Sequence, residues 1–356
     1  MKKIVIVFLT VILLCITITG CKNEKTESKT AETSTTKTTK TTAEVPSNIV
    51  TNKNFLTGAA LTNPNAFGKR PVAVMINNIK DALPQYGIEA ADIIFEVPVE
   101  GGITRLMAVY NDFTNVPKIC SVRSCRYYYP LIALGMDAIY IHWGADASIA
   151  TDTLKSTKID RFDGATLGVE YFGRDKERLK TYSSEHTGFL DGTKLAEAIQ
   201  KYGYRKDLSA DYGQTLFKFS ETQIIPSGIN CATAILNFSN AYFSTFTYDN
   251  ATTSYKKQHS GKPQIDSSTG NQLAFKNVII LQTDIKNRTN SKLMDVNLTK
   301  GKGKYISNGA EQDVLWSKAG NKSPIVLTKL DGTPLLINKG KSYIAFIGNE
   351  KTITIS

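Results

Sequence analysis

Cysteine, histidine and tryptophan are all scarce in this chain of 356 residues, which has 5, 3 and 2 of them respectively. Two of the cysteines, Cys15 and Cys21, lie near the N-terminus, which leaves Cys120, Cys125 and Cys231 for the rest of the chain. Such a small, odd number cannot form a complete disulfide framework, so the fold should not depend on oxidation. Cys120 and Cys125 are close enough in sequence to pair if the chain turns back between them.

Metal-ligand spacing and cofactor motifs are also missing. No two of His142, His186 and His259 are spaced as metal ligands usually are, so the sequence predicts neither a metal site nor a cofactor. A site that joins His142, His186 and a carboxylate in three dimensions stays open as an alternative. Gly301-Lys302-Gly303 lacks the remainder of a phosphate-binding loop and is expected to be a turn.

Positive charge is in excess, but it is not clustered. The formal net charge of +11 becomes +9 once Lys2 and Lys3 are removed with the leader described below. This excess suits anionic surroundings such as a membrane face or an acidic cell-wall polymer. The lysines alternate with acidic residues and no nucleic-acid-binding module is recognisable, so no nucleic acid partner is expected.

A targeting segment and a polar tether are predicted to precede the fold. Residues 1–20 combine a basic start with an apolar run that is shorter than the roughly 20 residues of a membrane-spanning helix, which indicates a signal peptide. A small residue before Cys21 is similar to the bacterial lipobox, which implies that Cys21 is lipidated and anchors the protein on the extracytoplasmic face of the cell membrane. The alternative is an ordinary secretory signal. Residues 21–48 are rich in Thr, Lys, Ser and Glu, which predicts a disordered tether.

The rest of the chain divides into two regions of different pattern. Residues 49–210 mix apolar strand-like runs with helical segments, which predicts an α+β or α/β ligand-binding domain. Residues 211–356 carry short runs separated by Gly and Asn turns, which predicts a β-rich, mainly antiparallel C-terminal domain. In the first region we expect strands over 72–76, 92–97, 103–110 and 138–143 and helices over 126–136, 146–155 and 194–202. In the second we expect strands over 216–219, 232–238, 242–248, 278–283, 314–316, 325–328 and 342–347.

Carboxylates flank the turn between the two strands expected near residue 100. Glu96 and Glu100 bracket the start of the Glu-Gly-Gly-Ile-Thr-Arg turn, and Arg105 follows on the next strand. Two carboxylates at a suitable separation can hydrolyse glycosidic bonds as acid and base. The alternative is that Glu100 forms a structural ion pair with Arg105 or Arg123.

A second polar segment follows at Arg123, Ser124 and Arg126. Two guanidinium groups with a hydroxyl and loop amides can bind a carboxylate or a phosphate. The alternative is that the same arginines are satisfied by the neighbouring acids. Ser124-Cys125-Arg126 has a faint likeness to the cysteine motif of L,D-transpeptidases, but a free cysteine is more commonly a small buried residue.

Three further residues are candidates for the same site. His142 ends an expected strand and is a candidate acid or base together with Glu100. Asp146 follows His142 closely, and His186 lies in a polar loop. With Glu96, Arg105, Arg123, Ser124 and Arg126, Asp146 and His186 complete the predicted ligand-binding set.

Several motifs together resemble the YerB-like bacterial lipoproteins, a two-domain family of undefined function. The resemblance is carried by the lipobox, by Arg70-Pro71-Val72-Ala73-Val74-Met75-Ile76-Asn77-Asn78, by Val99-Glu100-Gly101-Gly102-Ile103-Thr104-Arg105 and by Val122-Arg123-Ser124. It covers nearly everything after the tether. It implies the location and the architecture, and it brings no established catalytic residues.

Three hypotheses for the function follow. The first is a membrane-anchored lipoprotein that binds an anionic cell-wall-related ligand or supports the envelope. The second is an enzyme that acts on cell-wall polymer and uses Glu100 or His142 as acid or base. The third is a scaffold that contacts an envelope protein of a membrane-bound wall-synthesis complex.

Overall fold

The computed structural model describes residues 52–356, which form part of one compact unit. The predicted signal peptide, Cys21 and the tether over 21–48 lie outside the described residues. Among residues 52–356, no helix has the length and apolar character needed to cross a membrane.

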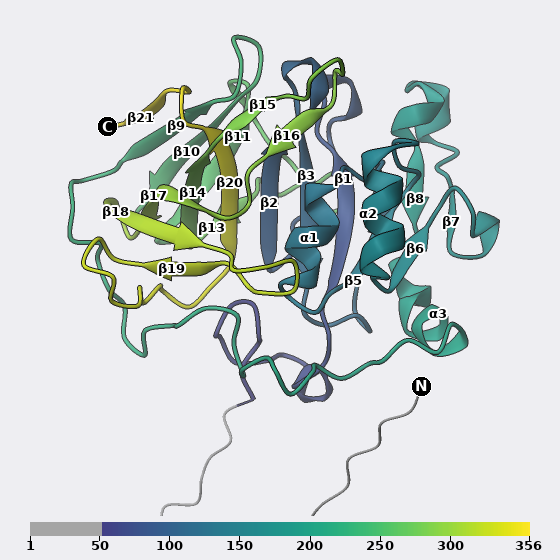
Figure 1. The fold of residues 1–356 in the computed structure, drawn as a ribbon, viewed down its shortest axis with the longest axis horizontal. Helices are drawn as coiled ribbons and strands as arrows, with labels where there is room; N and C mark the ends of the chain where they lie inside the picture. The colour runs from purple at the N-terminus through teal and green to yellow at the C-terminus, as the bar shows by residue number, and fades with distance from the viewer. Residues whose placement is uncertain (1–51) are drawn as a thin grey trace, which may run out of the picture. The chain divides into compact units, whose positions relative to one another are not determined.

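A ten-stranded mixed sheet runs through the described part of the chain (Figure 1). Its strand order is β19-β18-β17-β14-β20-β2-β3-β1-β5-β6. The first half of the chain supplies five adjacent strands, and the second half supplies the other five. Their bounds are β1 Val72–Asn77, β2 Ile93–Pro98, β3 Thr104–Tyr110, β5 Ile139–His142, β6 Arg161–Asp163, β14 Asn277–Thr283, β17 Lys300–Ser307, β18 Ala310–Ser317, β19 Val326–Thr328 and β20 Ser342–Gly348.

The two halves of the chain meet inside this sheet. β2 pairs in parallel with β20, with Ile93 opposite Ser342 and Glu96 opposite Ala345. The sheet is therefore continuous across the junction, and neither half has a free edge there. The division of the chain into domains at 49–210 and 211–356 remains a prediction from the sequence. In the structure, strands from both regions pair within one sheet.

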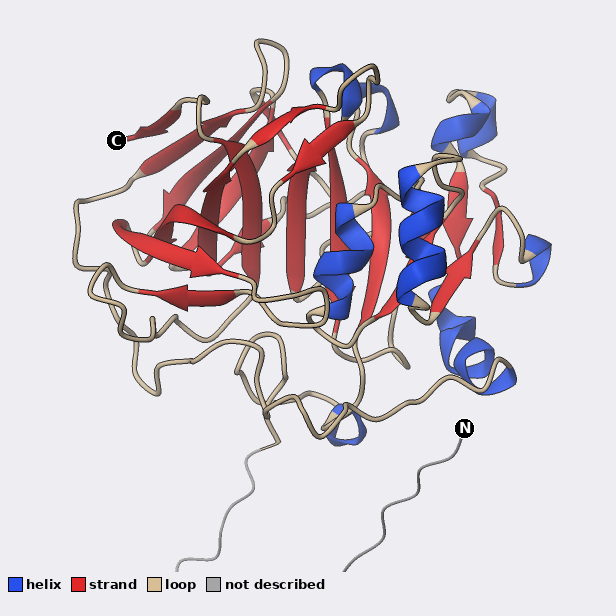
Figure 2. Ribbon diagram, viewed as in Figure 1, coloured by secondary structure: helices blue, strands red, loops and turns tan. Residues whose placement is uncertain are grey.

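Both faces of the central sheet are covered (Figure 2). Because side chains alternate along a strand, Val72 and Val74 of β1 enter one apolar core while Ala73 and Met75 enter the other. Helices α1 (Tyr128–Leu134) and α2 (Ile149–Thr157) pack on the second of these faces. On the first face lie α3 (Leu195–Lys201) and two smaller sheets.

The smaller sheets are antiparallel. One has the order β12-β11-β10-β9-β21, with β13 paired to β11, and the other has the order β4-β8-β7; a separate hairpin pairs β15 with β16. Their bounds are β4 Ile119–Cys120, β7 Phe172–Arg174, β8 Gly188–Leu190, β9 Thr233–Asn237, β10 Phe243–Asp249, β11 Ser254–His259, β12 Lys262–Pro263, β13 Ala274–Phe275, β15 Ile285–Asn287, β16 Met294–Val296 and β21 Ile353–Ile355.

The predicted fold class, an N-terminal mixed α and β region followed by a strand-rich region, is confirmed. Two local predictions are wrong. Residues 216–219 form no strand, because only Phe219 makes a bridge, to Ile337. Gly301 and Gly303 form no turn but lie in β17. Glycine is needed at these strand positions because a side chain at Gly301 would meet the Gln282 carbonyl of β14, and one at Gly303 would meet the Ile280 carbonyl.

Glu96 is the centre of a buried polar network on the first face of the sheet. The side chain is 1% exposed and accepts four hydrogen bonds, two from each half of the chain. These Glu96 network donors are Asn78 Nδ2 at 3.2 Å, Thr104 Oγ1 at 2.7 Å, Ser244 Oγ at 2.7 Å and Tyr343 Oη at 2.6 Å. A buried carboxylate that is fully hydrogen-bonded in this way is tolerated at low dielectric.

Lys257 and His259 of β11 are buried near the same carboxylate. Burial lowers the pKa of Lys257 to about 8, while the negative charge of Glu96 acts in the opposite direction. Burial and the Lys257 charge lower the pKa of His259 to about 4. His259 is thus neutral at pH 7, and its Nε2 donates to the Asn78 carbonyl at 2.9 Å.

We expect Glu96→Ala to lower the free energy of unfolding by about 3–5 kcal/mol, because it leaves four donors without their acceptor and the buried Lys257 without the nearby opposite charge. Denaturant titration followed by circular dichroism measures this loss. Glu177→Ala is the matched control, since that carboxylate is exposed and contacts only Lys180; it should change stability by about 0.5 kcal/mol or less. Equal losses for the two variants would contradict the role assigned to Glu96.

The low pKa of His259 predicts a pH-dependent stability. The folded pKa of about 4 lies below the ordinary value of 6.5, so this residue's contribution is complete above pH 6.5 and is lost as the pH falls towards 4. By pH 5 the loss should reach about 2 kcal/mol. His259→Gln, which keeps a donor for Asn78, should remove this part of the pH dependence. Parallel stability curves for the two proteins between pH 7 and 5 would show that the assignment is wrong.

Candidate functional site

The parallel strands β1, β5 and β6 all end on the same side of the central sheet. The row formed by their carboxyl ends is here called the edge. β3 is antiparallel to β1, so its first residues, including Arg105, lie at the same edge. In open α/β sheets this edge is where ligands commonly bind. The strand topology therefore brings Glu100 and Arg105 to the same side of the sheet as the ends of β1, β5 and β6.

The segment 121–125 lies across this edge and is held by backbone hydrogen bonds. Arg123 N donates to the carbonyl of Met75 in β1, and Trp143 N, directly after β5, donates to the Arg123 carbonyl. Cys125 N donates to the Gly144 carbonyl at 2.9 Å. The segment thus bonds to the last residues of β1 and to the residues that follow β5, which fixes the positions from which Arg123 and its neighbours project.

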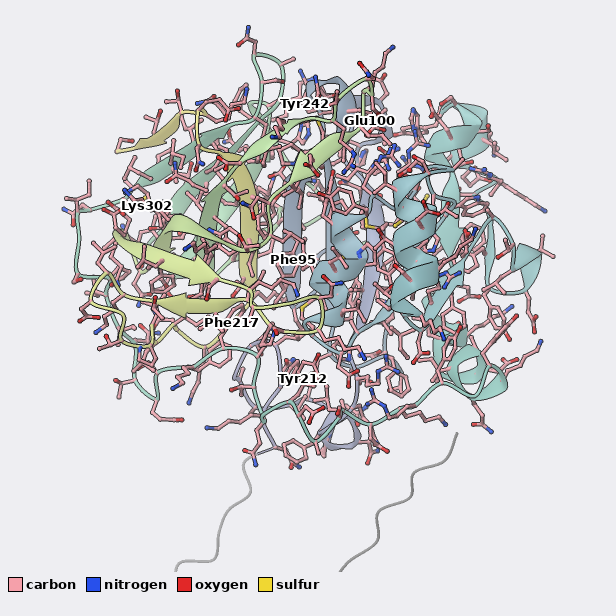
Figure 3. All side chains as sticks on the ribbon, viewed as in Figure 1. Phe95, Glu100, Tyr212, Phe217, Tyr242 and Lys302 are labelled. Atoms are coloured by element: carbon pink, nitrogen blue, oxygen red, sulfur yellow. The ribbon has the colours of Figure 1, made fainter. Side chains whose placement is uncertain are left out.

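Glu100 is presented by the turn between β2 and β3. Gly101 and Gly102 in this turn have φ values of 78° and 70°, a region that side-chain-bearing residues rarely adopt. The Gly-Gly pair is therefore required for the tight connection. Figure 3 shows Glu100 at the upper margin of the sheet, on the same side as Tyr242.

Arg105, Arg123 and Arg126, here called the arginine cluster, converge at this edge with two carboxylates. Arg126 contacts both oxygens of Glu100, with its Nε 2.8 Å from Oε2. Arg105 Nη2 lies 3.6 Å from the nearer Glu100 oxygen, and its Nη1 donates to the Ser124 carbonyl at 2.6 Å. Arg123 Nη2 donates to Glu185 Oε2 at 2.7 Å.

The electrostatics of the cluster follow from this arrangement. Burial and the charge of Arg126 lower the pKa of Arg105 to about 10, although Glu100 opposes the shift. The pKa of Glu100 is lowered because the hydrogen bonds and charges of Arg126 and Arg105 outweigh its partial burial. Glu100 is thus a carboxylate held by arginines, although its nearest partner is Arg126, whereas the sequence left open a pairing with Arg105 or Arg123.

His142 and Asp146 have structural surroundings. His142 is fully buried, and its Nδ1 donates to the Gly144 carbonyl at 2.9 Å; burial lowers its pKa. Asp146 Oδ1 accepts from the backbone of Ser148 and Ala150 at the start of α2. His142 is fully buried and both oxygens of Glu100 are held by Arg126, so the acid and base roles expected for them stay a prediction.

His186 lies on the 3₁₀ turn Ser184–His186, here called the edge turn. It is buried, and its Nδ1 faces Asn77 Nδ2 at 3.0 Å. Since that amide nitrogen is a donor, Nδ1 accepts and the ring hydrogen is on Nε2, 3.5 Å from Glu185 Oε1. Among residues 52–356, no group of three His, Cys, Asp or Glu residues is arranged to hold a metal ion.

Glu96 and Ser124 differ from their predicted places. Glu96 belongs to the predicted ligand-binding set, but it lies on the opposite face of the sheet from Arg105, since Thr104 Oγ1 donates to it and successive side chains alternate. Ser124 contributes its carbonyl, which holds Arg105, whereas a hydroxyl donor was expected. The sequence pattern placed both residues near the site without resolving which face or which atom would be used.

Sequence reasoning missed Glu185, which belongs to the edge turn, and Arg174 and Arg178, which donate to its carbonyls. Arg174 Nη1 donates to the Ser184 carbonyl at 2.6 Å, and Arg178 is buried with its Nε 3.1 Å from the His186 carbonyl. Nothing in their local sequence distinguishes these residues from ordinary surface charges. They reach the site only because β7 and β8 fold back beside β4.

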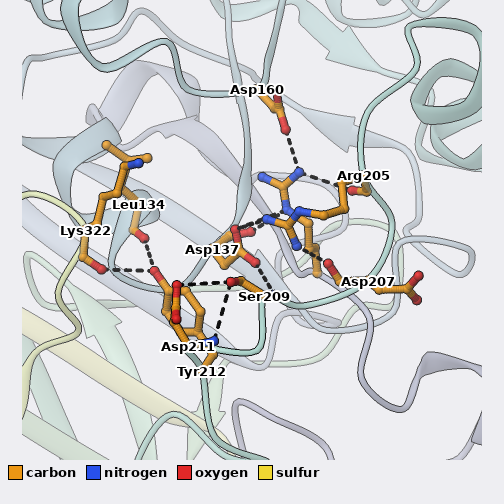
Figure 4. A network of polar contacts seen from close by, with 10 residues as sticks. Leu134, Asp137, Asp160, Arg205, Asp207, Ser209, Asp211, Tyr212 and Lys322 are labelled. Carbon is orange, nitrogen blue, oxygen red and sulfur yellow. Dashed lines mark hydrogen bonds and ion pairs between the residues drawn. The ribbon is translucent and has the colours of Figure 1, made fainter. Parts of the chain in front are cut away.

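A pocket of about 490 Å³ lies at the other margin of the molecule and was also not predicted. Tyr212, which lines it, is at the lower margin in Figure 3, far from Glu100. Asp137 in its wall pairs with Arg205 at 2.6 Å and accepts from Ser209 N at 2.9 Å (Figure 4). These charges satisfy one another within the first half of the chain. Tyr212 Oη lies 2.7 Å from the Leu134 carbonyl and 2.9 Å from the Lys322 carbonyl, so it links the two halves.

Comparisons with known proteins give the family. The N-terminal domain of a family described as protein of unknown function (DUF3048) matches residues 56–205, and its C-terminal domain matches residues 234–344. Together these ranges cover more than half of the chain. The chain belongs to this family.

The similar proteins are YerB proteins, as the sequence motifs indicated. A Bacillus subtilis (strain 168) protein named "Putative lipoprotein YerB" is 26% identical over 314 residues, which cover 88% of this chain and 91% of that protein. A crystal structure of YerB protein from Bacillus subtilis has a TM-score of 0.73 at 25% identity and covers 85% of this chain and 99% of that chain. The resemblance to YerB-like lipoproteins is thereby confirmed, and the family name leaves the function open.

Cys125 gives a prediction about reactivity. Cys120, Cys125 and Cys231 are free and buried, and burial raises the pKa of Cys125 to about 12. We therefore expect iodoacetamide at pH 8 to leave Cys125 unmodified in the folded protein and to alkylate it fully in denaturant. Peptide mapping by mass spectrometry distinguishes it from the other cysteines. Rapid alkylation of Cys125 in the folded protein would revive its role as a nucleophile.

Proposed function

We propose that this protein is a lipoprotein anchored in the cell membrane through Cys21 and that its arginine cluster binds an anionic cell-wall-related ligand on the extracytoplasmic side. The anchoring part of the proposal comes from the signal peptide and lipobox of the sequence. It agrees with the name of the Bacillus relative. The ligand-binding part comes from the sheet edge described above.

The single observation that carries the binding proposal is the excess of guanidinium over carboxylate. Three arginines share Glu100 and Glu185. Arg105 is 6% exposed, yet its nearest carboxylate oxygen is beyond hydrogen-bond distance at 3.6 Å. A bound anion would supply the missing negative charge and would be held in charge-assisted, bidentate geometry.

A scaffold is the second candidate, because each arginine already has a partner within the chain. Ion pairs of this kind can serve only to stabilise the loops of the edge. In that case the protein would contact a membrane-bound partner through another surface. The enzyme hypothesis receives no comparable support from Glu100 or His142.

Calorimetric titration with a short poly(glycerol phosphate) and, separately, with a muramyl tripeptide tests the proposal and separates phosphate from carboxylate ligands. Arg123→Ala should weaken binding about tenfold, since a hydrogen bond between charged groups contributes about 1.5 kcal/mol or more. Affinity should also decrease as salt is raised.

Arg205→Ala is the matched control. Like Arg123, Arg205 is partly exposed and paired with one carboxylate, that of Asp137, but it lies at the other margin of the sheet. It should leave the affinity for either probe unchanged. If wild type and Arg123→Ala bind equally well, Arg123 does not hold the ligand. If neither probe binds at all, the scaffold becomes the better proposal.

A further inference from the structure

The backbone of the edge turn is held by three arginines. Each guanidinium donates to a different carbonyl of the turn, so the turn is fixed independently of its side chains. The bonds are Arg174 Nη1 to Ser184 O at 2.6 Å, Arg123 Nη1 to Glu185 O at 3.3 Å and Arg178 Nε to His186 O at 3.1 Å.

The Glu185 side chain, in contrast, is only lightly held. It is 53% exposed and contacts Arg123 at 2.7 Å and His186 Nε2 at 3.5 Å. Its pKa is lowered, mainly by the hydrogen bond from Arg123. The carboxylate therefore lies where two donors, one charged and one neutral, point to the same place.

We propose that Glu185 is a displaceable internal occupant of an anion site, and that the phosphate or carboxylate of the ligand replaces its side chain on Arg123. The inference rests on the proposed function and adds a mode of regulation to the same site. Glu185 imitates the ligand chemically, because a carboxylate and a phosphate oxygen accept the same guanidinium hydrogen bonds.

Displacement needs little rearrangement. Arg123 would still donate to the Glu185 carbonyl, and its own backbone would still be bonded to Met75. The guanidinium is thus positioned before the ligand arrives, and only the Glu185 side chain has to rotate away. An ion pair that is half exposed to solvent opposes such a rotation by a factor of only about two to five.

The charge balance at the turn favours the exchange. The charges that act on the Glu185 carboxylate and lower its pKa are those of Arg123, His186 and Arg105. The nearby Asp175 is paired with Lys118 at 2.6 Å, whereas the charge of Asp81 acts on His186. When Glu185 rotates towards solvent, Arg123 and His186 Nε2 lose their contact with its carboxylate. An incoming anion would meet a site that is more positive than the resting structure suggests.

The test compares Glu185→Gln with the wild type in titrations with poly(glycerol phosphate). We expect binding about fivefold tighter, because the internal competitor is lost. Glu185→Ala should behave alike. Glu170→Gln removes the same charge from a partly exposed glutamate that pairs with Lys201 at 2.7 Å, and it should change the affinity less than about twofold.

Two further measurements make the test specific. In an Arg123→Ala background, Glu185→Gln should no longer strengthen binding, since the shared partner is gone. The carboxyl carbon of Glu185, followed by NMR, should titrate with a pKa nearer the ordinary value of 4.5 when ligand is bound. If Arg123→Ala weakens binding while Glu185→Gln and Glu170→Gln bind poly(glycerol phosphate) with the same affinity, Glu185 does not compete with the ligand, although the arginine cluster still binds it. If Arg123→Ala has no effect, the proposed function itself fails.

Discussion

The buried carboxylate of Glu96 is the constraint on which the rest of the structure depends. It accepts two hydrogen bonds from the first half of the chain and two from the second, and Lys257 of β11 supplies the opposite charge. A carboxylate without these partners would be very costly to bury. Burial of Glu96 therefore requires that the two halves of the chain pack together and supply its donors. This coupling locks β2 against β20 and covers their shared face with β10 and β11.

The locked sheet in turn positions the candidate site. The Gly-Gly turn that carries Glu100 connects the end of β2 to the start of β3. The register of β3 on β1 sets Arg105 opposite Asn77. Arg123 is placed by the backbone bonds to β1 and β5. The backbones of Arg105 and Arg123 are therefore fixed by strand pairing and backbone hydrogen bonds, whereas the half-exposed side chain of their competitor Glu185 contacts only Arg123 and His186. This division of rigidity is what a binding site with an internal occupant needs.

Most of the fold of the first half could be predicted because its strands are apolar and periodic. Val72–Asn77, for example, is buried along its whole length. Strand β11 could not be predicted, because its sequence Ser-Tyr-Lys-Lys-Gln-His is polar. Its Lys257 and His259 are buried near the charge of Glu96, which belongs to a distant part of the sequence. For the site, the arginine cluster was predicted and does converge. Glu185 was not, since its partner Arg123 is 62 residues away in sequence.

The shared sheet also determines how the function can be dissected. Removing residues 229–356 would delete β14 and β20 and leave β2 as an open edge, with the apolar face of the first half uncovered. Loss of a partner after such a truncation would report unfolding and could not be assigned to a binding surface. Single substitutions at the exposed Glu185 or the partly exposed Arg123 leave the Glu96 network intact. They are therefore the changes that separate ligand binding from the stability of the fold.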